Sequence, residues 1–203
     1  MRFRKVFSMS AVLGCAFLAA CTTTKSEVAF RPIGAEEARI VLQAPAFAEA
    51  SRRHLVHEES RNGNRTELLV AWTETYRLEA VLHNAGPDHV WKTVKTDPRE
   101  FLAEWRSFKD LDFDVERKQK VKTPIGFIDV WRVSSSSLRC ATWNHYLDRR
   151  HGVDFYGGRF MGYFCRNALR GLSDEMVIRT MEGFGLRGSG RPLPAPLPTG
   201  TPT

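Results

Sequence analysis

The most regular pattern in the chain is an alternation of apolar and polar residues between Thr66 and His83. Apolar side chains share the even positions: Leu68, Val70, Trp72, Tyr76, Leu78 and Leu82. Polar side chains share the odd positions: Glu67, Thr73, Arg77 and Glu79. A period of two is typical of a β-strand with one buried face. The run is long for one strand, so we expect a bend near residues 73–75; a helix over residues 74–83 is the alternative.

Turn signals predict further strands arranged in pairs. Arg53–Glu58 and Arg65–Trp72 flank Asn62-Gly63, and Asn-Gly tolerates the positive φ angles of a tight hairpin. Pro45–Ser51 is expected to form a helical turn. The other predicted strands are Arg39–Gln43, Phe113–Val121, Ile125–Val133, Leu138–Leu147 and Arg159–Arg166.

A first helix is predicted to begin at Asp97-Pro98-Arg99-Glu100. Asp97 suits the N-cap and Pro98 the first turn, and Glu100 is placed to reach back to the cap. The next apolar residues make one stripe: Phe101, Leu102, Trp105 and Phe108. Such a stripe is typical of a helix that packs on the core. A partner-binding helix is the alternative.

A second helix is predicted to follow Ser173, a good N-cap residue. Its apolar stripe consists of Val177, Ile178, Met181 and Phe184. Gly183, Gly185 and Gly188 mark its end. Strands in runs, with helices between and after them, indicate an α+β fold. We expect one antiparallel sheet with both helices on the same face.

The predicted domain spans residues 38–187, and a chain of about 150 residues buries enough surface for a core. Residues 188–203 contain five prolines and no aromatic residue. Such a segment buries too little surface to fold. It is therefore predicted to be a disordered, Pro-rich tail.

The N-terminus has the order of parts found in secretory signals. Residues 1–5 carry Arg2, Arg4 and Lys5, and residues 6–19 are uncharged and mostly apolar. A run of 14 residues is too short to span a bilayer, which needs roughly 20. It fits the apolar region of a signal peptide. Removal of these three cations lowers the net charge from +7 to +4, so no nucleic acid is expected as a partner.

This segment ends in Leu18-Ala19-Ala20-Cys21, which resembles the lipobox of bacterial lipoproteins. The resemblance implies a signal peptide over residues 1–20, cleavage before Cys21, and acyl chains on its sulfur and new amine. Residues 21–37 would then be a lipidated tether, with the lipid bilayer as the partner. Thr22 stands where an aspartate tends to retain such proteins at the inner membrane, which implies the outer membrane, facing the periplasm. The alternative is an ordinary signal peptide that leaves Cys21 as a free thiol.

Of the four cysteines, Cys15 leaves with the signal and Cys21 takes the lipid. Cys140 and Cys165 remain in an oxidising compartment, where a disulfide is expected. The two predicted strands that carry them form a hairpin, which sets the two residues opposite each other. A redox or metal-binding pair is the alternative, but the sequence has no Cys-x-x-Cys motif.

No motif predicts a catalytic residue, a cofactor or a metal site. His54 and His57 are three residues apart on a predicted strand, so they point to opposite faces. No Gly-x-Ser-x-Gly elbow or phosphate-binding loop is present. The sequence therefore favours an interaction or binding domain of the cell envelope. A hydrolase acting on an envelope polymer, such as peptidoglycan or a glycan, is the alternative.

Two features are candidates for recognition of an envelope protein or an anionic envelope polymer. The predicted loop 148–158 carries cations and rings together: Arg149, Arg150, Phe155 and Tyr156. Both kinds of side chain are common at binding hot spots, although the rings could instead belong to the core. Residues 117–122 form a basic run that suits an exposed sheet edge. Binding of anionic envelope material is the alternative.

Overall fold

The computed structural model describes residues 29–59, 62–86, 90–91, 94–150 and 155–197, with only the backbone at residue 150. The predicted signal peptide, the lipobox with Cys21, and the first part of the tether lie outside these residues. So does the last part of the predicted tail, residues 198–203.

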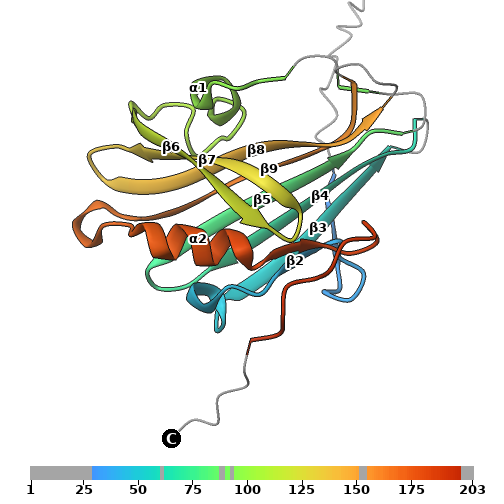
Figure 1. The fold of residues 1–203 in the computed structure, drawn as a ribbon, viewed down its shortest axis with the longest axis horizontal. Helices are drawn as coiled ribbons and strands as arrows, with labels where there is room; N and C mark the ends of the chain where they lie inside the picture. Colours follow the sequence, from blue (N-terminus) through green and yellow to red (C-terminus); the bar gives the residue numbers. More distant parts are fainter. Residues whose placement is uncertain (1–28, 60–61, 87–89, 92–93, 151–154, 198–203) are drawn as a thin grey trace, which may run out of the picture.

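An antiparallel sheet of eight strands dominates the described part of the chain (Figure 1). The strands follow the order β1-β3-β4-β5-β9-β8-β7-β6 across the sheet. Their bounds are β1 Arg31–Ile33, β3 Ser51–Glu59, β4 Asn64–Trp72, β5 Tyr76–Asn84, β6 Asp114–Thr123, β7 Gly126–Ser134, β8 Leu138–Arg150 and β9 Phe155–Asn167. The predicted hairpins are therefore confirmed, including a turn with Gly63 at a φ of 63°.

Shorter elements complete the described fold. β2 (Ile40–Leu42) pairs with β10 (Phe184–Leu186), and the helical turn η1 covers Pro45–Phe47. A second such turn, η2, covers Ala168–Arg170. The two α-helices of the described residues are α1 (Pro98–Leu102) and α2 (Asp174–Glu182). Neither is long and apolar enough to cross a membrane.

Both helices begin where their caps predict. The Asp97 carboxylate accepts a hydrogen bond from the Arg99 amide, and the Ser173 hydroxyl accepts one from the Met176 amide. Helix α1 is shorter than its apolar stripe, and its chain continues in turns through residue 110. These turns still point Trp105 and Phe108 into the core, where they are 7% and 5% exposed.

The helices lie on opposite faces of the sheet, which corrects the expectation that both cover one face (Figure 1). The stripe of α1 packs with odd-numbered residues of β9, such as Met161 and Tyr163. Helix α2 packs with even-numbered ones, such as Phe160 and Phe164. Because β9 is apolar at both parities, it has two buried faces, and each face receives one helix.

The alternation over residues 66–83 marks strands correctly, but the predicted buried face is wrong for β4. Leu69 and Ala71 are fully buried, together with Leu78 of β5. Residues 73–75 form a hairpin turn in which Trp72 pairs with Arg77, so opposed residues of the two strands differ in parity. The same face therefore contains odd positions of β4 and even positions of β5.

The β8–β9 hairpin is longer than predicted. Arg149 pairs with Tyr156 and Arg150 with Phe155, so most of the predicted loop 148–158 is strand. The glycines that indicated a loop include Gly158, where an added Cβ would lie 3.3 Å from the His83 carbonyl oxygen and the Leu147 Cβ. Glycine is therefore explained here by the close approach of the neighbouring strands and not by a loop.

The ends of the domain also differ in part from the sequence prediction. Arg31–Ile33 pairs with β3, so the folded region begins inside the predicted tether 21–37. After β10, residues 187–197 form no helix or strand and are mostly exposed. This segment is consistent with a solvated tail that begins near residue 188.

Candidate functional site

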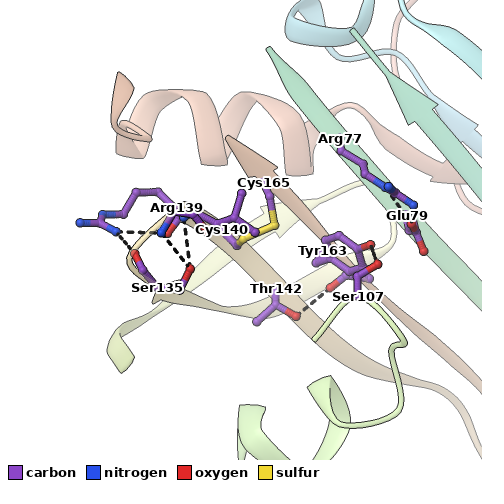
Figure 2. The surroundings of a disulfide bond; sticks show 12 residues. Arg77, Glu79, Ser107, Ser135, Arg139, Cys140, Thr142, Tyr163 and Cys165 are labelled. Atoms are coloured by element: carbon purple, nitrogen blue, oxygen red, sulfur yellow. Dashed lines mark hydrogen bonds and ion pairs between the residues drawn. A yellow bond between two sulfur atoms is a disulfide. The ribbon is translucent and has the colours of Figure 1, made fainter. Parts of the chain in front are cut away.

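Cys140 and Cys165 form a disulfide across β8 and β9, as the sequence predicts (Figure 2). They are directly opposed in the ladder, with their Cα atoms 4.1 Å apart. Both are buried, at 2% and 6% exposed. The bond therefore holds two central strands together beneath the covering segment that contains α1.

A pocket of about 660 Å³ opens next to this disulfide. We call it the disulfide pocket. Its walls come from β3, the β4–β5 turn, the segment after α1, and the facing ends of β8 and β9. The lining residues are Arg53, Val70, Trp72, Thr73, Glu74, Thr75, Tyr76, Arg77, Ser107, Phe108, Leu138, Tyr163, Cys165, Arg166 and Asn167.

The strand register explains the apolar floor of the pocket. One row of opposed residues runs from Arg53 through Val70 and Glu79 to Tyr163. Opposed residues of neighbouring strands place their side chains on the same face. The buried strand residues that pack with the α1 segment belong to β7, β8 and β9, whereas Val70 of β4 stays half-buried outside this cluster.

A second row runs parallel to the first, from Trp72 through Arg77 to Cys165 and Cys140. Phe108 closes the opposite side, where its ring lies 4.8 Å from the ring of Tyr163 in an edge-to-face contact. The pocket is thus the gap between the edge of the covering segment and the β4–β5 hairpin.

Arg53, Arg77 and Arg166 contribute to the pocket lining, together with one glutamate, Glu74. The Arg53 guanidinium lies over the Trp72 ring at 5.3 Å. The guanidinium of Arg166 lies over the Tyr76 ring at 5.1 Å, and both side chains extend to the α2 face of the sheet, where Tyr76 packs with Phe47. Arg166 donates to the carbonyl oxygens of residues 170 and 171, whereas its Nε is buried without a partner. Arg53 and Arg166 have no carboxylate partner among the described residues.

Arg77 differs because its charge is balanced. It donates two hydrogen bonds to Glu79 Oε1, at 3.0 and 2.7 Å. The hydrogen bond to Glu79 raises the pKa of Arg77. Figure 2 shows this ion pair beside the Tyr163 hydroxyl. Because Arg166 extends to the α2 face, the cation of this pocket that has no carboxylate partner among the described residues is Arg53.

A neutral donor lies at the floor of the pocket. The Tyr163 hydroxyl donates to Ser107 Oγ at 3.0 Å (Figure 2). Burial raises the pKa of Tyr163, so its hydroxyl stays protonated at neutral pH. Ser107 itself is exposed, which leaves its hydroxyl available to a bound molecule.

A buried polar cluster fastens the covering segment to the same face. Arg159, 2% exposed, donates to both oxygens of Glu104 at 2.8 and 3.1 Å and to Asn144 Oδ1 at 2.7 Å. Lys95 also donates to Glu104, at 2.8 Å. Burial alone would raise the pKa of Glu104, but its hydrogen bonds to Arg159 and Lys95 lower it. Every charge is paired, which indicates a structural cluster.

The four residues predicted for recognition lie at the other end of the β8–β9 hairpin from the disulfide. Arg149, Arg150, Phe155 and Tyr156 are paired in its ladder. Phe155 and Tyr156 are half-buried, and the Tyr156 ring lies 5.2 Å from that of Tyr146. The backbone of Tyr156 also bridges to Trp91. They lie in strands rather than in the predicted loop, and their role in binding stays a prediction.

The basic run 117–122 lies on β6, an edge strand of the sheet. Arg117 pairs with Asp174 of α2. Lys118 pairs with Asp129 at 2.7 Å and lies over the Trp131 ring at 5.1 Å. Half of the run's cations are thus used within the fold, which favours the protected edge over a binding patch.

Sequence reasoning missed the disulfide pocket. Trp72 and Tyr76 were assigned only to a buried face, and Arg53, Ser107 and Arg166 carried no signal. The lining residues come from separate segments between Arg53 and Asn167, so no local motif contains them. Only Cys165, through the predicted disulfide, pointed to this place.

No family model, curated protein or solved structure matches this chain. Its function has to be argued from the geometry of its own residues. Among the residues that the structure describes, no group of three or more His, Cys, Asp or Glu side chains could hold a metal ion.

The neutral form of His83 gives a prediction about acid stability. Its Nδ1 lies 2.9 Å from Thr66 Oγ1. Burial, helped by the charge of Arg159, lowers its pKa from 6.5 to about 4. Folding thus favours the uncharged ring, and this contribution is complete above pH 6.5 and lost as the pH falls toward 4. The free energy of unfolding should drop by about 2–3 kcal/mol from this group between pH 7.5 and 4.5.

Urea unfolding of wild type and His83→Gln at both pH values isolates this contribution, because the carboxylates titrate equally in the two proteins. We expect the wild type to lose more stability than the variant over this range. Equal losses would show that His83 does not titrate with a lowered pKa.

Proposed function

We propose that this chain is a membrane-anchored lipoprotein of the bacterial envelope whose domain binds a ligand in the disulfide pocket. One observation carries the proposal: an aromatic-lined hollow of about 660 Å³ contains an arginine, Arg53, that has no carboxylate partner among the described residues. Small-ligand sites are typically concave, largely apolar and of this size, with a few placed polar groups. The Cys140–Cys165 bond makes the floor rigid, which lowers the entropic cost of binding.

Binding is favoured over hydrolysis by the side chains at the pocket. Ser107 has no histidine beside it among the lining residues, and Glu74 is their only carboxylate. An activated nucleophile or an acid–base pair needs such neighbours. The contents of the pocket therefore support recognition and supply no catalytic pair.

The proposed anchor is Cys21, acylated and held in the outer membrane with the domain facing the periplasm. The disulfide supports this address, because such bonds persist in oxidising compartments. Three acyl chains would hold the protein firmly, whereas one would bind marginally. The domain would then work at the membrane surface.

Cell fractionation of the Cys21→Ser variant tests this proposal. We expect the wild type in the membrane fraction and the variant either unprocessed or soluble, because the acceptor sulfur is gone. Cys15→Ser is the matched control and should fractionate like wild type. A Cys21→Ser protein of mature size that stays wholly with the membrane would contradict the anchor.

The binding part of the proposal is tested in the same cells with a photo-crosslinking amino acid at Ser107, an exposed position in the pocket wall. We expect a light-dependent adduct in the native lipidated protein. The matched control places the crosslinker at Arg106, the exposed neighbour outside the lining set. Equal adducts at both positions, or none at Ser107, would argue against the disulfide pocket as a binding site.

A further inference from the structure

We propose that the disulfide pocket binds an amphiphile with one acyl chain and one anionic head. This inference rests on the proposed function and names the class of its ligand. It depends on an apolar floor and on one cation beside it, Arg53, that has no carboxylate partner among the described residues.

The floor suits an acyl chain because its side chains are rings and aliphatic groups. Val70 and Trp72 are half-buried and belong to neither core cluster, and Leu138 packs at the edge of the cluster beneath α1. The Cys165 sulfur and the Phe108 ring continue this surface toward α1. Water beside such a wall finds few hydrogen-bond partners. The hydrophobic effect therefore favours an apolar chain that covers the wall.

The head must be anionic because of Arg53. This arginine is exposed on β3, makes no ion pair with any described residue, and lies over the Trp72 ring beside the apolar floor. A carboxylate or phosphate oxygen would pair with it, since charge-assisted hydrogen bonds to arginine are strong.

The arrangement distinguishes one head from a repeating anion. Arg53 is a single cation without a carboxylate partner at this hollow, whereas a polymer of anionic units needs cations spaced along an extended surface. On the sheet edge that has such spacing, Arg117 and Lys118 are already paired. The geometry thus favours a discrete amphiphile over an acidic glycan.

The test is a titration of 11-(dansylamino)undecanoic acid, a fluorescent fatty-acid probe, into the full-length chain carrying Cys21→Ser. This variant has no lipid of its own, so neither a bilayer nor detergent competes for the probe. We expect saturable enhancement of dansyl fluorescence. Displacement of the probe by unlabelled fatty acids of eight to twelve carbons measures their affinities. These affinities should rise about fourfold for each added methylene.

Two further titrants distinguish the contribution of the anionic head to binding from that of the acyl chain. Dodecanol, which has the chain without the charge, should displace the probe at least tenfold more weakly than dodecanoic acid. Inorganic phosphate, which has charge without a chain, should not displace it at millimolar concentration. Displacement by phosphate, or affinity that does not depend on chain length, would overturn the amphiphile.

Variants of two pocket residues test whether the ligand binds in this pocket. Arg53→Gln should weaken dodecanoic acid about tenfold and leave the dependence on chain length unchanged, because only the head loses a partner. Val70→Trp should reduce binding of acid and alcohol alike by filling the floor. Arg179→Gln is the matched control: this arginine is exposed on α2, on the opposite face of the sheet, and its loss should have no effect.

Melting temperatures of all variants show whether a loss of binding reflects unfolding; Arg53→Gln, at an exposed position, should melt like wild type. Binding that is unchanged in both Arg53→Gln and Val70→Trp would overturn the assignment to this pocket. The two proposals fail differently. An adduct at Ser107 in cells without fatty-acid binding would reject the amphiphile and keep the pocket, whereas absence of both would reject the proposed function as well.

Discussion

Replacing Glu67 by alanine is expected to destabilise the domain by about 3–5 kcal/mol. Glu67 is fully buried on β4, where the sequence pattern predicted an outward-facing polar residue. Its carboxylate accepts hydrogen bonds from the backbone amides of Arg39 and Ile40, at 3.0 and 2.7 Å. Without it, both amides lose their acceptor beside β2, and each buried unpaired donor costs about 1–3 kcal/mol.

Urea unfolding at pH 7.5 measures this loss. Glu67→Gln keeps the shape and one acceptor oxygen, so it should lose less stability than the alanine variant. Glu58→Ala is the matched control on neighbouring β3, where the side chain is 48% exposed and pairs with Arg65; it should change stability by less than about 1 kcal/mol. A similarly small effect at Glu67 would mean that the two amides find other acceptors.

The second large effect is expected when Cys140 and Cys165 are both replaced by alanine. The bond closes a loop with a sequence separation of 25. In the chain-entropy model, a loop of this size contributes about 3.5 kcal/mol by restricting the unfolded chain. For a domain of this length, that loss should lower the melting temperature by about 10 °C.

Thermal unfolding checks this expectation, with Cys21→Ser present in both proteins so that no other mature thiol interferes. Mild reductant should leave the wild type oxidised in its folded state, because both sulfurs are buried. Unreduced peptide mapping should give one Cys140–Cys165 link. A double alanine variant that melts within about 2 °C of the wild type would show that the bond contributes little to stability.

The features that the sequence predicted correctly are local ones: helix starts, a hairpin turn and a disulfide within one hairpin. Asp97 and Ser173 mark helix starts because their side chains accept hydrogen bonds from amides two or three residues away. Asn62-Gly63 marks a hairpin because glycine reaches positive φ cheaply. The pairing of Cys140 with Cys165 followed from the two strands that carry them. Each of these signals depends on neighbours along the chain or within one hairpin.

The features that no local pattern predicted depend on contacts between distant segments. Glu67 is buried because the amides of β2 come to it from residues 39 and 40, and no period along β4 contains that information. The opposite placement of α1 and α2 followed from the two apolar faces of β9. Arg53, Ser107 and Cys165 share one pocket only because the sheet order aligns β3, β4, β5 and β9 and the segment after α1 packs on β9. Side-chain periodicity specifies that a strand has faces, but the partners that arrive from elsewhere in the chain decide which face is buried and where a hollow remains.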